Sequence, residues 1–191
     1  MMKHLYLMRH GETLFNVRHK IQGWCDSPLT KNGIEQAKKA GALLQGIPFD
    51  HYYSSTAERC CDTLEIVAGN VPYQRLKALK ERNFGIFEGE SEDLNPSWHD
   101  PSFTYDDLFP HYGGEYLRDV SKRMVEALTE IMEKPDHQYV LAVSHAGACY
   151  GFCEGLSAPI DLTLNGGFKN CNILHFTYDQ HTFSFIEILH I

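Results

Sequence analysis

Short apolar runs that alternate with helical stretches constrain the fold of this chain more than any other feature. Leu5 to Met8 and Tyr139 to Val143 are unbroken apolar runs of strand length, which is typical of strands buried on both faces of a parallel sheet. Between them, apolar residues recur at helical spacing, most clearly at Leu117, Val120, Met124, Leu128 and Ile131. The alternation predicts an α/β fold of three layers, α/β/α, with a mostly parallel central sheet.

Capping and turn residues indicate where the other elements begin and end. Thr30 can cap the start of a helix, and Gly46 and Gly69 can end two of them. The expected helices span about Lys31–Gln45, Ala57–Ala68, Glu115–Lys134 and Ala146–Gly155. A hairpin formed by Asn172–Tyr178 and Phe183–Leu189, turning at Asp179-Gln180-His181, would add an antiparallel edge strand to the sheet.

The length of 191 residues favours one domain over residues 1–191, and neither an internal repeat nor a linker divides it. Periodicity fails between Leu76 and Gly114, and long irregular segments in compact domains are usually lids or binding loops. We therefore expect an irregular lid at about residues 83–115. Between Asn83 and Leu117 this segment carries eight acidic residues and no Lys or Arg.

Composition narrows the class of partner and the compartment. A net charge of −8 argues against a nucleic-acid or anionic-membrane surface. No apolar run approaches the roughly 20 residues that cross a bilayer, and the stretch before Arg9 is too short for a secretory leader. The six cysteines include no Cys-x-x-Cys pair, so we expect reduced thiols and no structural zinc. A soluble, cytoplasmic protein is expected.

Reactive side chains follow both buried runs at the point where each run ends. Arg9-His10-Gly11-Glu12-Thr13 follows the first run, and Ser144-His145-Ala146-Gly147 follows the second. Open α/β sheets bind ligands at the carboxyl ends of their strands. His10 and His145 are therefore expected to face one crevice.

Arg59 is expected beside the same crevice, because the strand before Ser54 ends at the same edge of the sheet. The guanidinium groups of Arg9 and Arg59 match phosphate oxygens in shape and charge. Gly11 lets the backbone approach closely, and a helix that begins near Ala146 directs its positive end toward an anion. The pattern predicts a phosphate site that needs no metal and no cofactor.

Other phosphate chemistries lack their motifs in this chain. It contains no Gly-x4-Gly-Lys-Ser/Thr loop, no Gly-x-Gly-x-x-Gly, no Asp-x-Asp, no Cys followed six residues later by Arg, and no Gly-x-Ser-x-Gly elbow. Histidine is the nucleophile that remains. Its attacking nitrogen must be neutral, and nearby Arg9 and Arg59 disfavour the protonated form.

These residues resemble the histidine phosphatase superfamily, also called the phosphoglycerate mutase-like family. Thr13 stands where the acid phosphatase and phytase branch normally carries an Arg, so the chain is more similar to the branch that includes the cofactor-dependent mutases. The matching segments cover most of the chain: Arg9-His10-Gly11-Glu12-Thr13 with Asn16, Gln22-Gly23, Asp26 to Thr30 with Gly33, Ser54 to Thr63, Leu79 to Gly85 with Glu88-Gly89, and Ser144 to Gly147.

The resemblance implies a phosphoglycerate mutase-like fold and a role for each matched residue. His10 would become phosphohistidine, and Glu81 would protonate the leaving oxygen and then act as base toward water. Arg9, Arg59 and His145 would hold the phosphoryl oxygens. Further phosphate or substrate contacts are expected from Asn16, Gln22, Gly23 and Ala146.

The acidic lid favours a phosphomonoesterase acting on small phosphate monoesters over the two alternatives. A phosphoglycerate mutase must hold extra negative groups, which the lid would repel. A non-catalytic module that binds phosphoryl ligands would not need a proton donor at Glu81. The leaving side of the substrate is expected to be neutral or apolar, stacked on Trp98, Phe103 or Tyr105. The sequence predicts neither the physiological substrate nor the oligomeric state.

Overall fold

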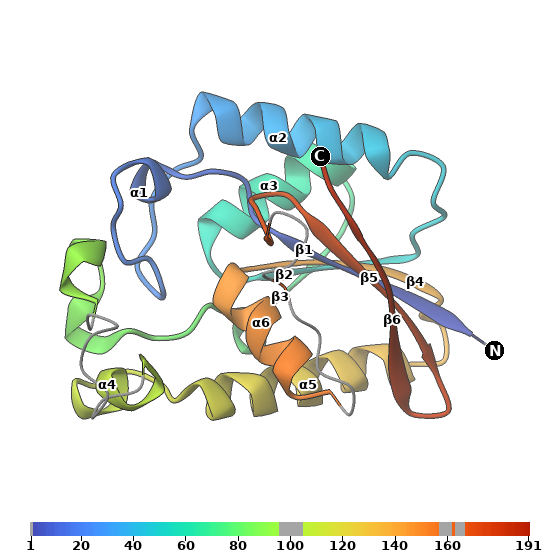
Figure 1. Ribbon diagram of the computed structural model, residues 1–191. Coiled ribbons are helices and arrows are strands. Elements are labelled where there is room, and N and C mark those ends of the chain that lie inside the picture. The colour runs from blue at the N-terminus through green and yellow to red at the C-terminus, as the bar shows by residue number, and fades with distance from the viewer. Residues whose placement is uncertain (1, 96–104, 157–161, 163–166) are drawn as a thin grey trace.

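The computed structural model describes residues 2–95, 105–156, 162 and 167–191, and of residues 105–107 it describes the backbone alone (Figure 1). Within these residues a six-stranded sheet has the order β3-β2-β4-β1-β5-β6. The strands are β1 Lys3–Arg9, β2 His51–Ser55, β3 Gln74–Leu76, β4 Tyr139–Ser144, β5 Ile173–Asp179 and β6 Thr182–Leu189. Strands β3, β2, β4 and β1 run parallel to one another, and β5 is antiparallel to both β1 and β6.

The antiparallel edge therefore contains the hairpin that the sequence predicts, although its turn is tighter than expected. Gln180 and His181 both adopt a positive φ, 47° and 61°. Two consecutive residues in this region form the hairpin turn that matches the twist of the flanking strands. Asp179 consequently pairs with Thr182, and both belong to the strands.

Helices cover both faces of the sheet, which confirms the predicted three layers (Figure 1). Helices α2 (Lys31–Leu43) and α3 (Glu58–Ala68) lie on one side, and α5 (Leu117–Glu133) and α6 (Ala146–Glu154) on the other. In β1, Leu5 and Leu7 pack in the core cluster with the second pair, and Tyr6 and Met8 pack in the cluster with the first pair. A strand that buries both faces must be apolar at every position, which explains the unbroken run.

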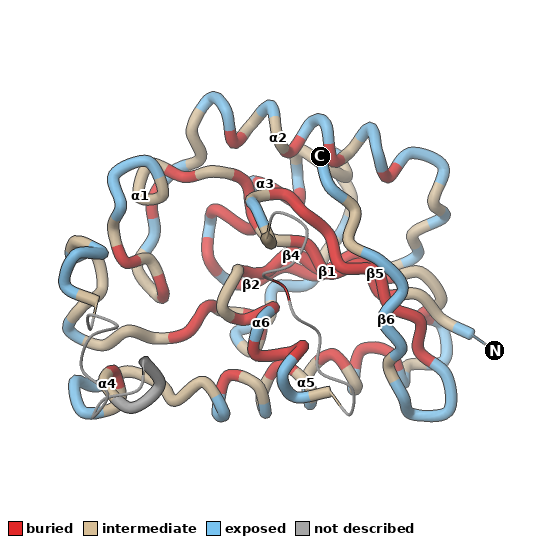
Figure 2. The backbone as a smooth tube through the Cα atoms, viewed as in Figure 1, coloured by how far each residue is buried: buried red, intermediate tan, exposed pale blue. Residues whose placement is uncertain are grey.

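Some helices begin or end at residues other than the expected ones, and for α5 the reason is the extended backbone of the flanking residues. Helix α5 begins at Leu117 because Tyr116 is extended, and it ends at Glu133 because Lys134, which precedes a proline, is extended too. Helix α2 ends at Leu43, short of the expected Gln45. Buried residues concentrate in the central strands and recur at intervals along these helices, whereas β6 is mostly exposed (Figure 2).

The segment expected to be irregular contains short regular elements. Strand β3 precedes three 3-10 turns, Lys77–Leu79, Gly85–Phe87 and Glu92–Leu94, and helix α4 spans Tyr105–His111. A further short helix, α1 (Leu14–Val17), follows β1 and is capped by the Thr13 side chain. These elements have seven residues at most, so they are too short to show a clear periodicity.

No helix among the described residues has both the length and the apolar character that a membrane span requires.

Candidate active site

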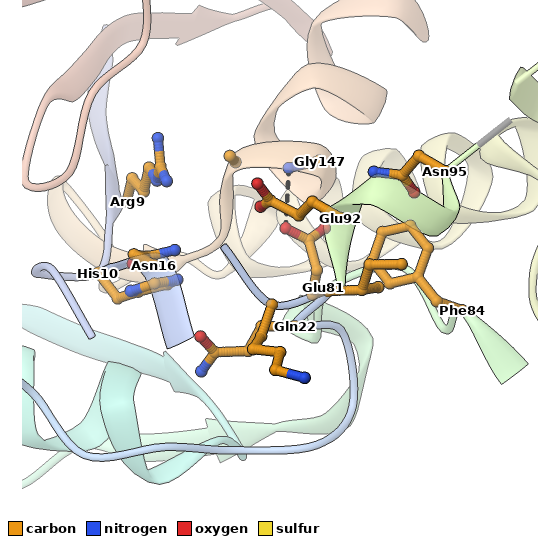
Figure 3. A pocket seen from close by; sticks show the side chains of 12 residues that line it. Arg9, His10, Asn16, Gln22, Glu81, Phe84, Glu92, Asn95 and Gly147 are labelled. Atoms are coloured by element: carbon orange, nitrogen blue, oxygen red, sulfur yellow. Dashed lines mark hydrogen bonds between the residues drawn. The ribbon is translucent and has the colours of Figure 1, made fainter. Parts of the chain in front are cut away.

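A cavity of about 220 Å³ opens at the carboxyl ends of β1 and β4 (Figure 3). The two strands pair in parallel with Arg9 opposite Ser144, so the histidines that follow them become neighbours. The ring centroids of His10 and His145 lie 5.3 Å apart. The cavity is lined by Arg9, His10, Asn16, Lys20, Ile21, Gln22, Glu81, Phe84, Glu92, Asn95, Ala146 and Gly147.

His10 is held as a neutral imidazole with one nitrogen available. Its Nδ1–H donates to the Gly11 carbonyl at 2.8 Å, and because a carbonyl only accepts, the lone pair resides on Nε2. Burial, followed by the positive charges of Arg59 and Arg9, holds the pKa of His10 well below its usual value. The side chain lines the cavity although it is only 5% exposed. These are the properties of a nitrogen nucleophile.

Gly11 must be a glycine because of the helix packed against it. A Cβ at Gly11 would lie 2.7 Å from the Gly33 carbonyl oxygen in α2. The Gly11 amide donates to Thr63 Oγ1 in α3 at 3.0 Å. The turn after β1 is therefore fixed by both helices of one layer, and with it the position of the His10 ring.

Arg9 contributes positive charge to the cavity wall. Its Nη1 donates to the Phe168 carbonyl at 2.8 Å, which anchors one end of the guanidinium. Its Nε–H is buried and has no partner among the described residues. A buried donor without a partner is costly, and an anion in the cavity would compensate for it.

Arg59 and His145 lie behind this wall, fully buried, instead of lining the cavity. Arg59 Nη2 donates to His145 Nδ1 and to the Gly23 carbonyl, each at 2.8 Å. His145 therefore carries its proton on Nε2, which donates to Ser55 Oγ at 2.8 Å. Burial and then Arg59 keep the pKa of His145 well below its usual value. The sequence-predicted residues are thus brought together, in two layers.

The Glu81 carboxyl lies in the cavity and keeps its proton more readily than an ordinary glutamate. Burial raises its pKa, against the lowering effects of backbone N–H groups and of Arg59 and Arg9. The amides of Arg82 and Gly147 donate to its two oxygens at 2.8 and 2.9 Å. A Cβ at Gly147 would come within 2.6 Å of Glu81 Oε1, so a side chain at this position would displace the carboxyl from its place.

Asn16 and Gln22 line the cavity with their amide groups oriented by Thr13. Asn16 Oδ1 accepts from the Thr13 amide at 3.1 Å and from Asn170 Nδ2 at 3.3 Å. Gln22 Oε1 accepts from Thr13 Oγ1 at 2.7 Å, and its buried Nε2 has no partner within the described part of the chain. With its oxygen occupied, Asn16 presents its N–H donors to the cavity (Figure 3), whereas the amide nitrogen of Gln22 is buried.

The two remaining predicted residues occupy different positions. Ala146 lines the cavity at the start of α6. Gly23 does not line it, because the Gly23 amide donates to Glu88 Oε2 at 3.1 Å and its carbonyl accepts from Arg59. The Gly23 backbone therefore contacts the second layer of the site and not the cavity.

Sequence reasoning missed the part played by Glu88. Its carboxylate accepts hydrogen bonds of 2.8 to 3.1 Å from the amides of Gly23, Trp24, Cys25 and Phe84. It thereby ties the loop of residues 22–26 to the segment that carries Glu81. Nothing in the local pattern distinguishes Glu88 from its acidic neighbours, because its partners are distant in the chain.

Lys20 and Glu92 are also cavity residues that the sequence did not indicate. A backbone bridge between Lys20 and Ser91 brings the two segments together. Lys20 adds a positive charge to the cavity from outside the lid, so the net charge of the lid alone does not describe the cavity. In addition, the lid residue Glu115 is neutralised by an ion pair with Arg123 at 3.1 Å. Trp98 and Phe103, which were expected to stack on the leaving group, lie outside the described residues, and so does the side chain of Tyr105.

A possible metal-ligand group lies at the other end of the sheet, at His51, Asp136 and His137, whose donor atoms are all within 4.8 Å of one another. The rings of His51 and His137 stack with centroids 3.5 Å apart and an interplanar angle of 12°. In-plane lone pairs of parallel rings do not converge on one ion. We assign no metal to this group.

Comparisons with known proteins agree with this geometry. The model of the histidine phosphatase superfamily, branch 1, matches residues 5–189. The probable phosphoglycerate mutase GpmB of Proteus mirabilis is 33% identical over 190 residues, which cover 94% of this chain and 86% of that protein.

Solved structures of similar fold include a mutase and a phosphatase. Phosphoglycerate mutase from Bacillus anthracis superposes with a TM-score of 0.84 at 28% identity, covering 97% of this chain and 92% of that one. Phosphoserine phosphatase from Entamoeba histolytica, in complex with 3-phosphoglyceric acid, gives 0.81 at 27% identity, covering 99% and 98%.

Fold and site thus define an α/β protein of the phosphoglycerate mutase-like class, as the sequence predicts. The chain belongs to the histidine phosphatase superfamily, branch 1. Its similar proteins include both phosphatases and mutases, so family membership leaves open the choice between hydrolysis and transfer.

Proposed function

We propose that this protein hydrolyses phosphate monoesters through a phosphohistidine formed on His10. The observation that carries the proposal is the pairing of two groups in one cavity. A neutral His10 presents Nε2, and the Glu81 carboxyl is held with a raised pKa. A nucleophile and a proton donor on one cavity are what ester cleavage needs.

The reaction proceeds in two steps with the proton returned to its origin. The Nε2 lone pair attacks phosphorus, the ester P–O bond breaks, and the leaving oxygen takes the proton of Glu81. The Glu81 carboxylate then takes a proton from water, and the water oxygen attacks phosphorus. The N–P bond breaks, inorganic phosphate leaves, and His10 and Glu81 are restored.

Charge on the phosphoryl oxygens is neutralised by donors of the cavity. Arg9 and the amide nitrogen of Asn16 face it, and the helix start at Ala146 adds its positive end. Arg59 acts from behind the wall by keeping His10 unprotonated. Direct contact of Arg59 and His145 with phosphate stays a prediction. Because these groups supply the charge, we expect the reaction to need no metal ion.

A mutase is the second candidate, since the GpmB relative bears that name and Lys20 adds a cation to the cavity. Both activities would begin with the same phosphohistidine. They differ in whether water or a second phosphoglycerate hydroxyl receives the phosphoryl group.

Hydrolysis of p-nitrophenyl phosphate in excess chelator tests the proposal. We expect turnover that survives the chelator and is lost in His10→Ala. Transfer restricted to phosphoglycerates would favour the mutase. Absence of turnover with retained binding of inorganic phosphate would favour a binding module. Either result would overturn the proposal.

A further inference from the structure

A second cavity, of about 320 Å³, adjoins the catalytic one and has walls of a different character. Its walls are mostly apolar side chains: Phe84, Leu117, Tyr150, Leu162 and Phe168. The two cavities share Phe84 and the first turn of α6, with Ala146 and Gly147. The two cavities therefore adjoin at these three residues.

The shared wall is where the proton donor is held. The Gly147 amide donates to Glu81 Oε2, so the carboxyl lies at the boundary between the two cavities. On the phosphate side, the carbonyl of Phe168 anchors Arg9, while Phe168 itself lines the apolar cavity. When the leaving oxygen of an ester takes its proton from Glu81, the carbon chain attached to that oxygen would be directed toward these apolar walls.

The apolar cavity is built from fixed side chains. The Phe84 amide is bound by Glu88, and its ring packs edge-on against Phe109 with centroids 4.8 Å apart. Leu162 is only 4% exposed, and Phe168 packs against the main core cluster. A preformed apolar site binds without the cost of ordering its walls.

Arg82, a charged residue at this cavity, is already engaged. Its guanidinium lies over the Phe109 ring, 5.0 Å from the centroid, and its Nε donates to the Glu115 carbonyl at 2.8 Å. A carboxylate that entered the cavity would lose its hydration among the apolar walls. An alkyl or aryl group would gain from the same transfer.

We propose that this apolar cavity binds the leaving group, and that the protein selects phosphate monoesters of apolar alkyl or aryl alcohols. The inference rests on the proposed function for its catalytic part. As a statement about binding, it stands on the shared wall and on the chemistry of the lining. It places the selectivity of the site on α6, on Phe168 and on Phe84 at the start of the acidic lid.

Binding of n-alkyl phosphonates, measured by calorimetry, tests the cavity without requiring turnover. From methylphosphonate upward, Kd should fall about fourfold for each added methylene until the cavity is filled. Hydroxylated phosphonates of equal length should bind more weakly than the alkyl compounds. A Kd that does not change with chain length would overturn the proposal, and so would tighter binding of the hydroxylated series.

Two substitutions at side chains of equal exposure provide a matched pair. Tyr150 and Phe185 are each 37% exposed, and Phe185 lies on β6, away from the cavity. Tyr150→Asn, which makes the wall polar without adding charge, should reduce the gain in affinity per methylene while changing methylphosphonate binding less than binding of the longer alkyl compounds. Phe185→Asn should retain the full trend. An unchanged trend in Tyr150→Asn contradicts the assignment, and the wild-type series remains decisive if that variant does not fold.

Turnover of the matching n-alkyl phosphates separates this inference from the proposed function. Their leaving groups have nearly constant basicity beyond ethyl, so differences in kcat/KM report binding. A Kd trend without His10-dependent hydrolysis would leave the apolar site in place and reject the phosphatase. His10-dependent hydrolysis with a flat series would retain the phosphatase and reject the apolar site.

Discussion

At the scale of single residues, the site depends on two groups whose protonation is set by their surroundings. The pKa of His10 is lowered by burial and by two arginines, and that of Glu81 is raised by burial. The competent form, neutral His10 with protonated Glu81, therefore extends over a wider pH range than free side chains would allow. One environment thus produces both a nucleophile and an acid.

The Glu81→Gln variant should separate esters by their leaving group. Loss of the proton donor should lower kcat/KM for alkyl phosphates by about 10²- to 10⁴-fold, the usual range for general acid catalysis. The first step with p-nitrophenyl phosphate should be affected far less, because that leaving group departs without a proton. A burst assay measures this step. Equal losses for both kinds of ester would contradict the assignment of Glu81.

Because two neutral histidines are buried, we expect the free energy of unfolding to depend on pH. The pKa values of His10 and His145 lie well below 6.5 in the folded chain. The unfolded chain therefore binds protons that the folded chain does not as the pH falls below about 6.5. The free energy of unfolding should decline by up to about 1.4 kcal/mol per pH unit for each histidine. Urea unfolding at pH 7.5 and 5.5 measures it, and equal stability at both would contradict the burial argument.

At the scale of elements, the long periodic segments were predictable and the short ones were not. Strands β1 and β4 are recognisable in the sequence as unbroken apolar runs, because each strand buries both of its faces. Strand β3 is a tripeptide, Gln74-Arg75-Leu76, that is exposed at its two polar positions and becomes a strand only by pairing with β2. Helix α1 is four residues long and depends on its Thr13 cap. Pairing partners distant in the chain leave no local pattern.

The loop of residues 22–26 is an element held by one carboxylate, which makes it testable. Glu88→Gln replaces an anionic acceptor of four amide donors by a neutral one. Charge-assisted hydrogen bonds contribute about 1.5–3 kcal/mol, so the free energy of unfolding should fall by about 2 kcal/mol, with a lower kcat/KM. Glu90→Gln removes the same charge two residues away and should change neither. Identical behaviour of the two variants in urea unfolding and assay would refute the role of Glu88.

At the scale of the whole molecule, the parallel strands of the sheet end at the same edge, so residues that are distant in the sequence meet there. That much could be inferred, because the strand ends after Met8 and Val143 carry the reactive histidines. The layering of the site could not be inferred. Arg59 and His145 are fully buried behind the cavity, and Lys20 reaches it through a bridge to Ser91. Burial depth and cross-chain bridges are properties of the assembled fold.

The covalent state of His10 during turnover is the most direct test of the account. Rapid acid-free quenching with p-nitrophenyl phosphate, whose leaving group needs no proton, followed by intact-mass and peptide mass spectrometry, should find one phosphoryl group on the peptide that contains His10. The adduct should accumulate in Glu81→Gln, whose base toward water is missing, and be absent from His10→Ala. Hydrolysis at full rate in His10→Ala, or a phosphoryl group on another residue, would contradict the central claim.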